Sequence, residues 1–145
     1  MSLSKSRRSI LFSMFGGLCA YCGQHLPEKG WHADHVEPLN RTGNYVRVEG
    51  DRSRTHKYVQ DGGCLNPEND REGNYMPSCR ACNINKSSCD LELWRSCLER
   101  SVDGMRRDHA SFRHAERFGL VAQVTTKVVF YFEFVQRERQ EHDGS

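Results

Sequence analysis

The spacing of apolar residues predicts helices on both sides of a polar middle. In residues 4–15, four apolar side chains recur at helical spacing, and two glycines follow that would end a helix. Asp90 is a suitable N-cap for a long helix that begins at Leu91, with Gly104 as a point where it could kink. The apolar stripe of that helix comprises Leu91, Trp94, Leu98, Val102, Met105 and Phe112. Such a stripe is typical of a helix that packs against a core.

The middle of the chain predicts short strands around a long polar stretch. Residues 31–36 predict a strand. Residues 40–73 are polar and rich in Gly and Asn, although Tyr45–Val48 could form one arm of a hairpin. Ordered structure should resume at residues 74–79, and a helical turn is expected at residues 80–86.

The end of the chain predicts a strand and completes an α+β assignment. Residues 127–135 are β-branched and aromatic, which favours a terminal strand. The 145 residues contain no internal repeat and have the length of one domain. We therefore expect a single domain over residues 1–145, with its core at about 16–90 and the long helix and strand at about 91–135.

Composition fits a globular protein that is slightly short of core material, with 37% apolar and 28% charged residues. A bound metal would help to stabilise such a chain. No run approaches the roughly 18 apolar residues of a membrane span, and the basic start lacks the apolar segment of a signal peptide. We expect an intracellular, cytoplasmic protein that has no membrane partner.

Charge gives a weaker indication of a nucleic-acid partner. The net charge is only +2, but basic residues outnumber acidic ones in two segments, near the N-terminus and in residues 41–60. The basic residues are Lys5, Arg7 and Arg8 in the first segment and Arg41, Arg47, Arg52, Arg54 and Lys57 in the second. Each group is as compatible with phosphate contact as with an ordinary solvated surface.

Cysteines provide the first specific chemical signal. Two C-x-x-C pairs occur: Cys19 with Cys22, and Cys79 with Cys82. A two-residue gap lets one turn direct both thiolates at a single tetrahedral ion, so these pairs predict a structural zinc site. The other three cysteines have no partner at ligand spacing and are expected to be ordinary thiols; they are Cys64, Cys89 and Cys97.

Four further residues lie between or beside the cysteine pairs. Asp34 and His35 are adjacent, Asn74 precedes Cys79 by five residues, and Asn83 follows Cys82 directly. Folding around the zinc would bring a carboxylate, an imidazole and a carboxamide close together. Phosphodiester cleavage needs such a set, because it requires a base for water and oxygen ligands for a hard cation.

The order C-x-x-C, D-H-x-x-P, then N-x-x-x-x-C-x-x-C-N-x-x-K resembles the HNH family of ββα-metal endonucleases. The resemblance covers Cys19–Lys86 and implies a small, zinc-stapled, treble-clef-like core. It also implies a metal-dependent nuclease that hydrolyses DNA. The remaining tail is weakly similar to stand-alone phage and prophage proteins of this family.

The resemblance also implies a role for each site residue. His35 would be the general base that deprotonates water, and Asn74 would brace the loop that carries His35 through backbone hydrogen bonds. Asp34 and Asn83 would bind a catalytic Mg²⁺, Mn²⁺ or another divalent ion. DNA is the expected partner, and no small-molecule cofactor is implied.

The chain departs from the family pattern in two places and raises two structural questions. Asn83 replaces the last histidine of the motif, and residues 41–63 are longer than usual, so we interpret them as an insertion that could contact DNA. Adjacent strand residues face opposite sides, which predicts irregular backbone at Asp34–Glu37. Lys86 could either meet the DNA backbone or favour its helix C-terminus.

Two other classes of function remain open. A zinc-knuckle module could hold DNA or RNA without cutting it. Alternatively, a redox protein could cycle its C-x-x-C pairs between thiol and disulfide.

Overall fold

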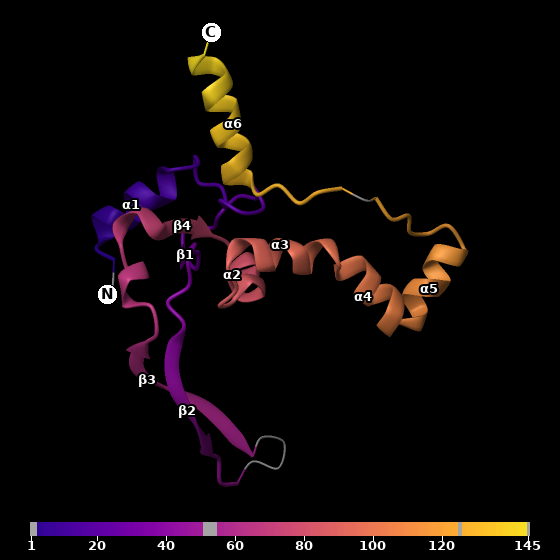
Figure 1. The fold of residues 1–145 in the computed structure, drawn as a ribbon, viewed down its shortest axis with the longest axis horizontal. Coiled ribbons are helices and arrows are strands. Elements are labelled where there is room, and N and C mark those ends of the chain that lie inside the picture. The colour runs from indigo at the N-terminus through magenta and orange to yellow at the C-terminus, as the bar shows by residue number, and fades with distance from the viewer. Residues whose placement is uncertain (1–2, 51–54, 125, 145) are drawn as a thin grey trace.

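Two separate two-stranded sheets and a series of helices form the part of the chain that the computed structural model describes, residues 3–50, 55–124 and 126–144. The expected α+β class is confirmed. Figure 1 shows a core around β1 and β4, a hairpin of β2 and β3 that projects from it, and an arm of α3, α4 and α5.

The core sheet pairs β1 (His32–His35) with β4 (Tyr75–Ser78) in antiparallel register. Helix α2 (Arg80–Lys86) follows β4 almost immediately, because Cys79 is its N-cap. Helix α1 (Lys5–Ser13) packs against β4 and begins after Ser4, whose hydroxyl accepts a hydrogen bond from the Arg7 amide. These elements confirm the first helix, the first strand and the helical turn.

The polar middle contains more regular structure than its composition indicates. Strands β2 (Arg41–Arg47) and β3 (His56–Cys64) form an antiparallel hairpin, followed by the short 3₁₀ helices η1 (Pro67–Asn69) and η2 (Glu72–Asn74). The expected hairpin is therefore longer than Tyr45–Val48. Arg52 and Arg54 of the basic segment lie outside the described residues.

The prediction of one long helix from Leu91 is wrong, because three helices occupy this region: α3 (Leu91–Glu99), α4 (Ser101–Asp108) and α5 (Ala110–Arg117). The backbone is extended at His109, and the Arg113 guanidinium donates to the carbonyls of Arg106 and Arg107 at the end of α4. Gly104 lies inside α4 and breaks nothing. Asp90 is the expected N-cap, since its carboxylate accepts from the Leu93 amide at 2.8 Å.

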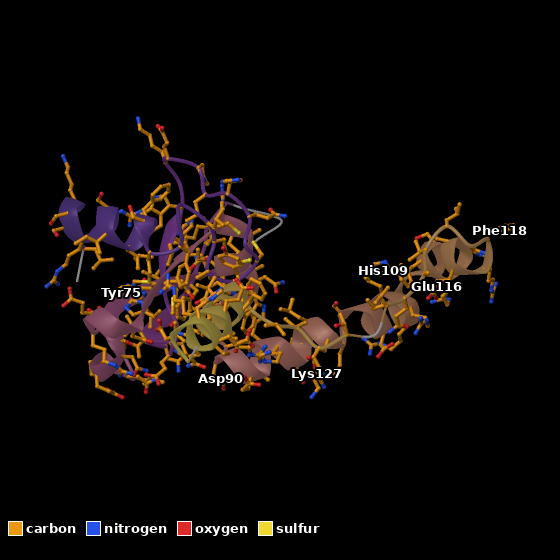
Figure 2. All side chains as sticks on the ribbon, turned by 90° about the horizontal axis from the view of Figure 1, so that it is seen from above. Tyr75, Asp90, His109, Glu116, Phe118 and Lys127 are labelled. Carbon is orange, nitrogen blue, oxygen red and sulfur yellow. The ribbon has the colours of Figure 1, made fainter. Side chains whose placement is uncertain are left out.

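Helices α3 to α5 form a helical arm that extends away from the core. Figure 2 shows His109, Glu116 and Phe118 towards its far end, well separated from Tyr75 in the core. An ion pair between Arg106 and Glu116, 2.6 Å apart, joins α4 to α5. The arm therefore has its own internal contacts.

The predicted terminal strand at 127–135 is also wrong, because helix α6 (Tyr131–Asp143) begins within it. Glu133 accepts a hydrogen bond from the Phe130 amide at 2.9 Å, which is the contact expected at a helix start. The amides of Tyr131 and Phe132 bond the carbonyls of Tyr21 and Ala20. The first turn of α6 is thus bonded to the turn that carries Cys19 and Cys22, and residues 126–130 form no strand.

An aromatic cluster fills the centre of the core. The Tyr21 ring contacts Trp94 edge to face at 5.1 Å, and Trp94 stacks on Phe130 at 4.9 Å. Trp94 is 3% exposed, and Leu91 and Leu98 pack against the same core, so the α3 part of the predicted stripe is confirmed. The prediction is wrong for the rest of the stripe, since Met105 is 40% exposed and α4 and α5 bury no residue. Among the described residues, no helix has both the length and the apolar character needed to cross a membrane.

Candidate metal centre and active-site cleft

The four cysteines of the C-x-x-C pairs converge at one point. Cys19 and Cys22 lie in a turn after α1, closed by a hydrogen bond from the Gly23 amide to the Cys19 carbonyl, while Cys79 and Cys82 open α2. All four Sγ atoms lie within 4.8 Å of one another. No other group of three or more His, Cys, Asp or Glu side chains in the described part of the chain is close enough to hold an ion.

The dimensions of this four-cysteine cluster fit one tetrahedral ion. Cys22 Sγ and Cys79 Sγ are 3.9 Å apart. A tetrahedral site with Zn–S bonds of about 2.3 Å places its sulfurs about 3.8 Å apart, whereas a disulfide bond would need about 2.05 Å. The cluster could therefore bind a structural metal such as zinc.

The environment of the thiols also favours a bound cation. The Cys82 thiol donates to Cys19 and lowers the pKa of Cys19 to about 4, while the same bond raises the pKa of Cys82 above its usual range. The Cys79 amide donates to Cys19 Sγ at 3.4 Å. Further thiolates in so small a cluster require a positive charge between them. Cys64, Cys89 and Cys97 lie outside the cluster.

A polar cleft of about 400 Å³ lies beside β1 and α2. Asp34 and His35 of β1 and Asn83 of α2 all line it, so the structure brings these three predicted residues together. His32 lines the same cleft, and so do Tyr58 and Gln60 at the base of the hairpin. The Asn83 carboxamide has no hydrogen-bond partner among the described residues, which leaves its oxygen available.

Two buried donors, Tyr21 and Lys86, hold the Asp34 carboxylate. Its Oδ2 accepts from the Tyr21 hydroxyl at 2.5 Å and lies 3.1 Å from Lys86 Nζ. Burial, followed by the charge of Asp34, raises the pKa of Tyr21 well above its usual range, so the phenol keeps the proton that it donates. No described residue donates to Oδ1, which remains free for a ligand in the cleft.

Lys86 lies in the last turn of α2, where a cation favours the helix C-terminus, as one of the two roles considered for it expects. It also holds both residues of the Asp34–His35 pair. The side chain is fully buried, and Nζ donates to the His35 carbonyl at 2.7 Å besides pairing with Asp34. DNA contact is excluded for a fully buried ammonium group. The available signal was the N-x-x-K spacing, which places Asn83 and Lys86 on one face of α2.

His35 is oriented by two residues that the sequence did not single out. Its Nε2 lies 3.2 Å from Asp70 Oδ1, and its ring packs on Tyr75 with centroids 4.3 Å apart. The Tyr75 hydroxyl donates to the same Asp70 oxygen. Burial and the hydrogen bond to Asp70 raise the pKa of Tyr75 to about 12, so this hydroxyl remains a donor at neutral pH.

Asn74 connects the two loops that meet at His35. Its Oδ1 accepts from the Glu37 amide, and its Nδ2 donates to the Glu37 and Asn69 carbonyls, each at 2.8 Å. Glu37 follows His35 by two residues, and Asn69 precedes Asp70. This is the kind of backbone brace that the HNH resemblance implies for Asn74.

The backbone at Asp34–Glu37 is more regular than expected. Asp34 pairs with Met76 and His35 with Tyr75, so both belong to a regular strand, and the irregular backbone begins only at Val36. The two side chains do face different partners, as strand alternation requires. They nevertheless border one cleft, because β1 ends there and leaves His35 at its edge.

Two of the three basic residues near the N-terminus, Arg7 and Arg8, contact other parts of the fold. The Arg8 guanidinium lies 4.2 Å from the centre of the Trp31 ring and donates to the Trp31 carbonyl. Arg7 pairs with Glu72 at 3.4 Å. These contacts make the N-terminal segment a weaker candidate for phosphate contact than the hairpin.

Comparisons of the chain with protein-family models, with curated proteins and with solved structures gave no match.

Replacing Cys79 by serine should remove the metal, because a tetrahedral site loses one of its four ligands. We expect about one zinc per wild-type chain after dialysis, and far less in the Cys79→Ser protein, by elemental analysis. The matched control is Cys97→Ser, whose exposed thiol lies outside the cluster. Equal zinc content in all three proteins would contradict the assignment.

Replacing Lys86 by methionine should destabilise the fold by about 3–5 kcal/mol, because it leaves a buried carboxylate without its cation. Urea unfolding of the metal-loaded protein, followed by tryptophan fluorescence, measures this loss. The control is Lys29→Met at an exposed position, where little change is expected. Similar midpoints for the two variants would show that the Lys86–Asp34 pair is unimportant.

Proposed function

We propose that this protein is a metal-dependent endonuclease of the HNH type that hydrolyses phosphodiester bonds of DNA. The observation that carries the proposal is a polar cleft that Asp34, His35 and Asn83 line together. The four-cysteine cluster, as a structural zinc site, would hold α2 and therefore Asn83 in place beside β1.

His35 is the proposed general base. Its Nε2 is engaged by Asp70, while Nδ1 has no hydrogen-bond partner among the described residues. Nδ1 is therefore the nitrogen that would accept a proton from the attacking water. The imidazole suits this task because its ordinary pKa lies near neutrality.

Asp34 and Asn83 are the proposed ligands of a catalytic divalent ion. Each offers a hard oxygen to the cleft, a donor set that fits Mg²⁺ or Mn²⁺, and such ions commonly take few protein ligands and complete their shell with water and phosphate. Tyr21 and Lys86 orient the Asp34 carboxylate, as outer partners of a metal ligand do. When bound, the ion would offset negative charge on the phosphate and on the departing oxygen.

The hairpin supplies a surface that continues the cleft. Tyr45 pairs with Tyr58 and Arg47 with His56, so strand alternation places these four side chains on one face. The two tyrosine rings are 5.3 Å apart. We call this surface the cleft face of the hairpin. It is continuous with the cleft, because Tyr58 and Gln60 line the cleft together with His35.

The shape and charge of the cleft face fit a nucleic acid. Tyr45 is 75% exposed and Tyr58 45%, so both rings offer flat apolar surface to solvent beside the Arg47 guanidinium. Gly43 makes room for this arrangement, since a Cβ there would lie 2.8 Å from the Tyr58 ring. A two-stranded ribbon of this kind can enter a groove of duplex DNA while its cations contact phosphates.

Plasmid cleavage tests the catalytic assignment. The zinc-loaded protein should nick or linearise supercoiled DNA with Mg²⁺ or Mn²⁺ and stop when EDTA is added. His35→Ala should lower the rate by about 10²–10⁴-fold, the range expected for a lost general base. His114→Ala, on the remote α5, should retain the wild-type rate.

The two alternative functions give different results in this experiment. A zinc-knuckle binding module would bind the plasmid and leave it intact with every metal. A redox protein would cycle between thiol and disulfide and hold no tightly bound zinc.

Salt-dependent binding tests the hairpin surface. In the His35→Ala background, Arg47→Ala should weaken binding to duplex DNA and reduce the slope of log affinity against log salt by about one. Lys57→Ala is the matched control, since Lys57 pairs with Val46 and so belongs to the opposite face. An equal or larger effect of Lys57→Ala would place the DNA on the other face.

A further inference from the structure

The imidazole of His35 has a carboxylate partner on an element remote in sequence. Asp70 lies between η1 and η2, 35 residues after His35, and its Oδ1 is 3.2 Å from His35 Nε2. Both side chains are largely buried, with 16% and 20% of their surface exposed. The contact is therefore only partly accessible to solvent.

The hydrogen-bonding capacity of the two groups fixes the position of the imidazole proton. An ionised aspartate is an acceptor only, and its ordinary pKa is about 3.9. A hydrogen bond between the two groups at 3.2 Å therefore requires Nε2 to carry the hydrogen. A neutral imidazole holds one proton, so Nδ1 is left with its lone pair.

On this basis we propose that Asp70 is a positioning residue, which holds the neutral His35 imidazole in the Nε2–H form and leaves Nδ1 as the base. The proposal rests on the proposed nuclease function, since it assigns Asp70 a role in that reaction. It makes Asp70 and His35 a carboxylate–imidazole dyad in which Asp70 acts on the reaction only through His35.

Two further side chains, Tyr75 and Asn74, support a built arrangement rather than a chance approach. The Tyr75 hydroxyl donates to Asp70 Oδ1, and the Tyr75 ring packs on the His35 ring, so one side chain contacts both members of the dyad. Asn74 bonds the backbone of Glu37 and Asn69, and thereby fixes the loop after His35 against the turn that carries Asp70.

The position of the proton can be measured without reference to activity. Long-range ¹H–¹⁵N spectra of the metal-loaded protein, at a pH where histidines are neutral, distinguish a protonated ring nitrogen from one with a free lone pair. His35→Ala assigns the signals. In the wild type we expect the Nε2–H form to predominate. A predominant Nδ1–H form would overturn the proposal, whatever happens to any variant.

Asp70→Asn provides the second arm of the test. Its carboxamide can donate to Nε2 and so favours the opposite tautomer, the change by which an Asp-to-Asn substitution impairs a catalytic triad. We expect a shift toward Nδ1–H and a fall in plasmid cleavage with Mn²⁺ of about 10²-fold or more. Zinc content and the thermal midpoint show whether the variant is folded.

The matched control is Glu68→Gln, which makes the same change of charge in the same turn at an exposed position. It should leave both the spectrum and the cleavage rate unchanged. An unchanged tautomer in folded Asp70→Asn, or cleavage equal to wild type, would overturn the role of Asp70. Absence of cleavage by the wild type with every metal would instead contradict the nuclease proposal, and the spectra would still report the tautomer.

Discussion

The convergence of four thiols ties together two segments of the chain that are nearly 60 residues apart. Cys22 and Cys79 are separated by 57 positions, and the chain between them contains β1, the whole hairpin and β4. Because Cys79 and Cys82 open α2, the cluster fixes where that helix starts and which face it presents to β1. The cleft exists only where β1 and α2 are held in this relation. A metal bound there would cross-link the two segments, which matters most for a chain with a small core.

The buried Lys86 contributes more to the positions of Asp34 and His35 than to the stability of the fold. A buried ion pair gains little over apolar packing, because removing both charges from water costs nearly as much as their attraction returns. Lys86 instead supplies geometry, since one ammonium group holds the Asp34 carboxylate and the His35 carbonyl at once. Tyr21 completes the support from the aromatic cluster. The side chains that border the cleft are thus positioned from inside the molecule.

Local motifs predicted most of the core and the candidate site, while long-range contacts decided the rest. The spacing within each C-x-x-C pair and the N-cap at Asp90 depend on neighbours in sequence. The convergence of the four cysteines and the Asp90 cap are both confirmed. Residues 127–135 have strand composition, but no strand lies beside them, and the Glu133 contact starts a helix there. Asp70 is missing from the sequence prediction because only the folded chain brings it to His35. The nuclease reaction itself stays a prediction.

The hairpin has a further consequence for the energetics of the molecule. Strands β2 and β3 pair only with each other, and most of their side chains are exposed, so the ribbon can open while β1 and β4 stay paired. Its amide hydrogens would then exchange with solvent through local opening, at a lower free energy than those of the core sheet. Mutations in the ribbon can therefore accumulate with little effect on global unfolding. The hairpin of β2 and β3 can therefore vary in sequence more freely than the core sheet of β1 and β4.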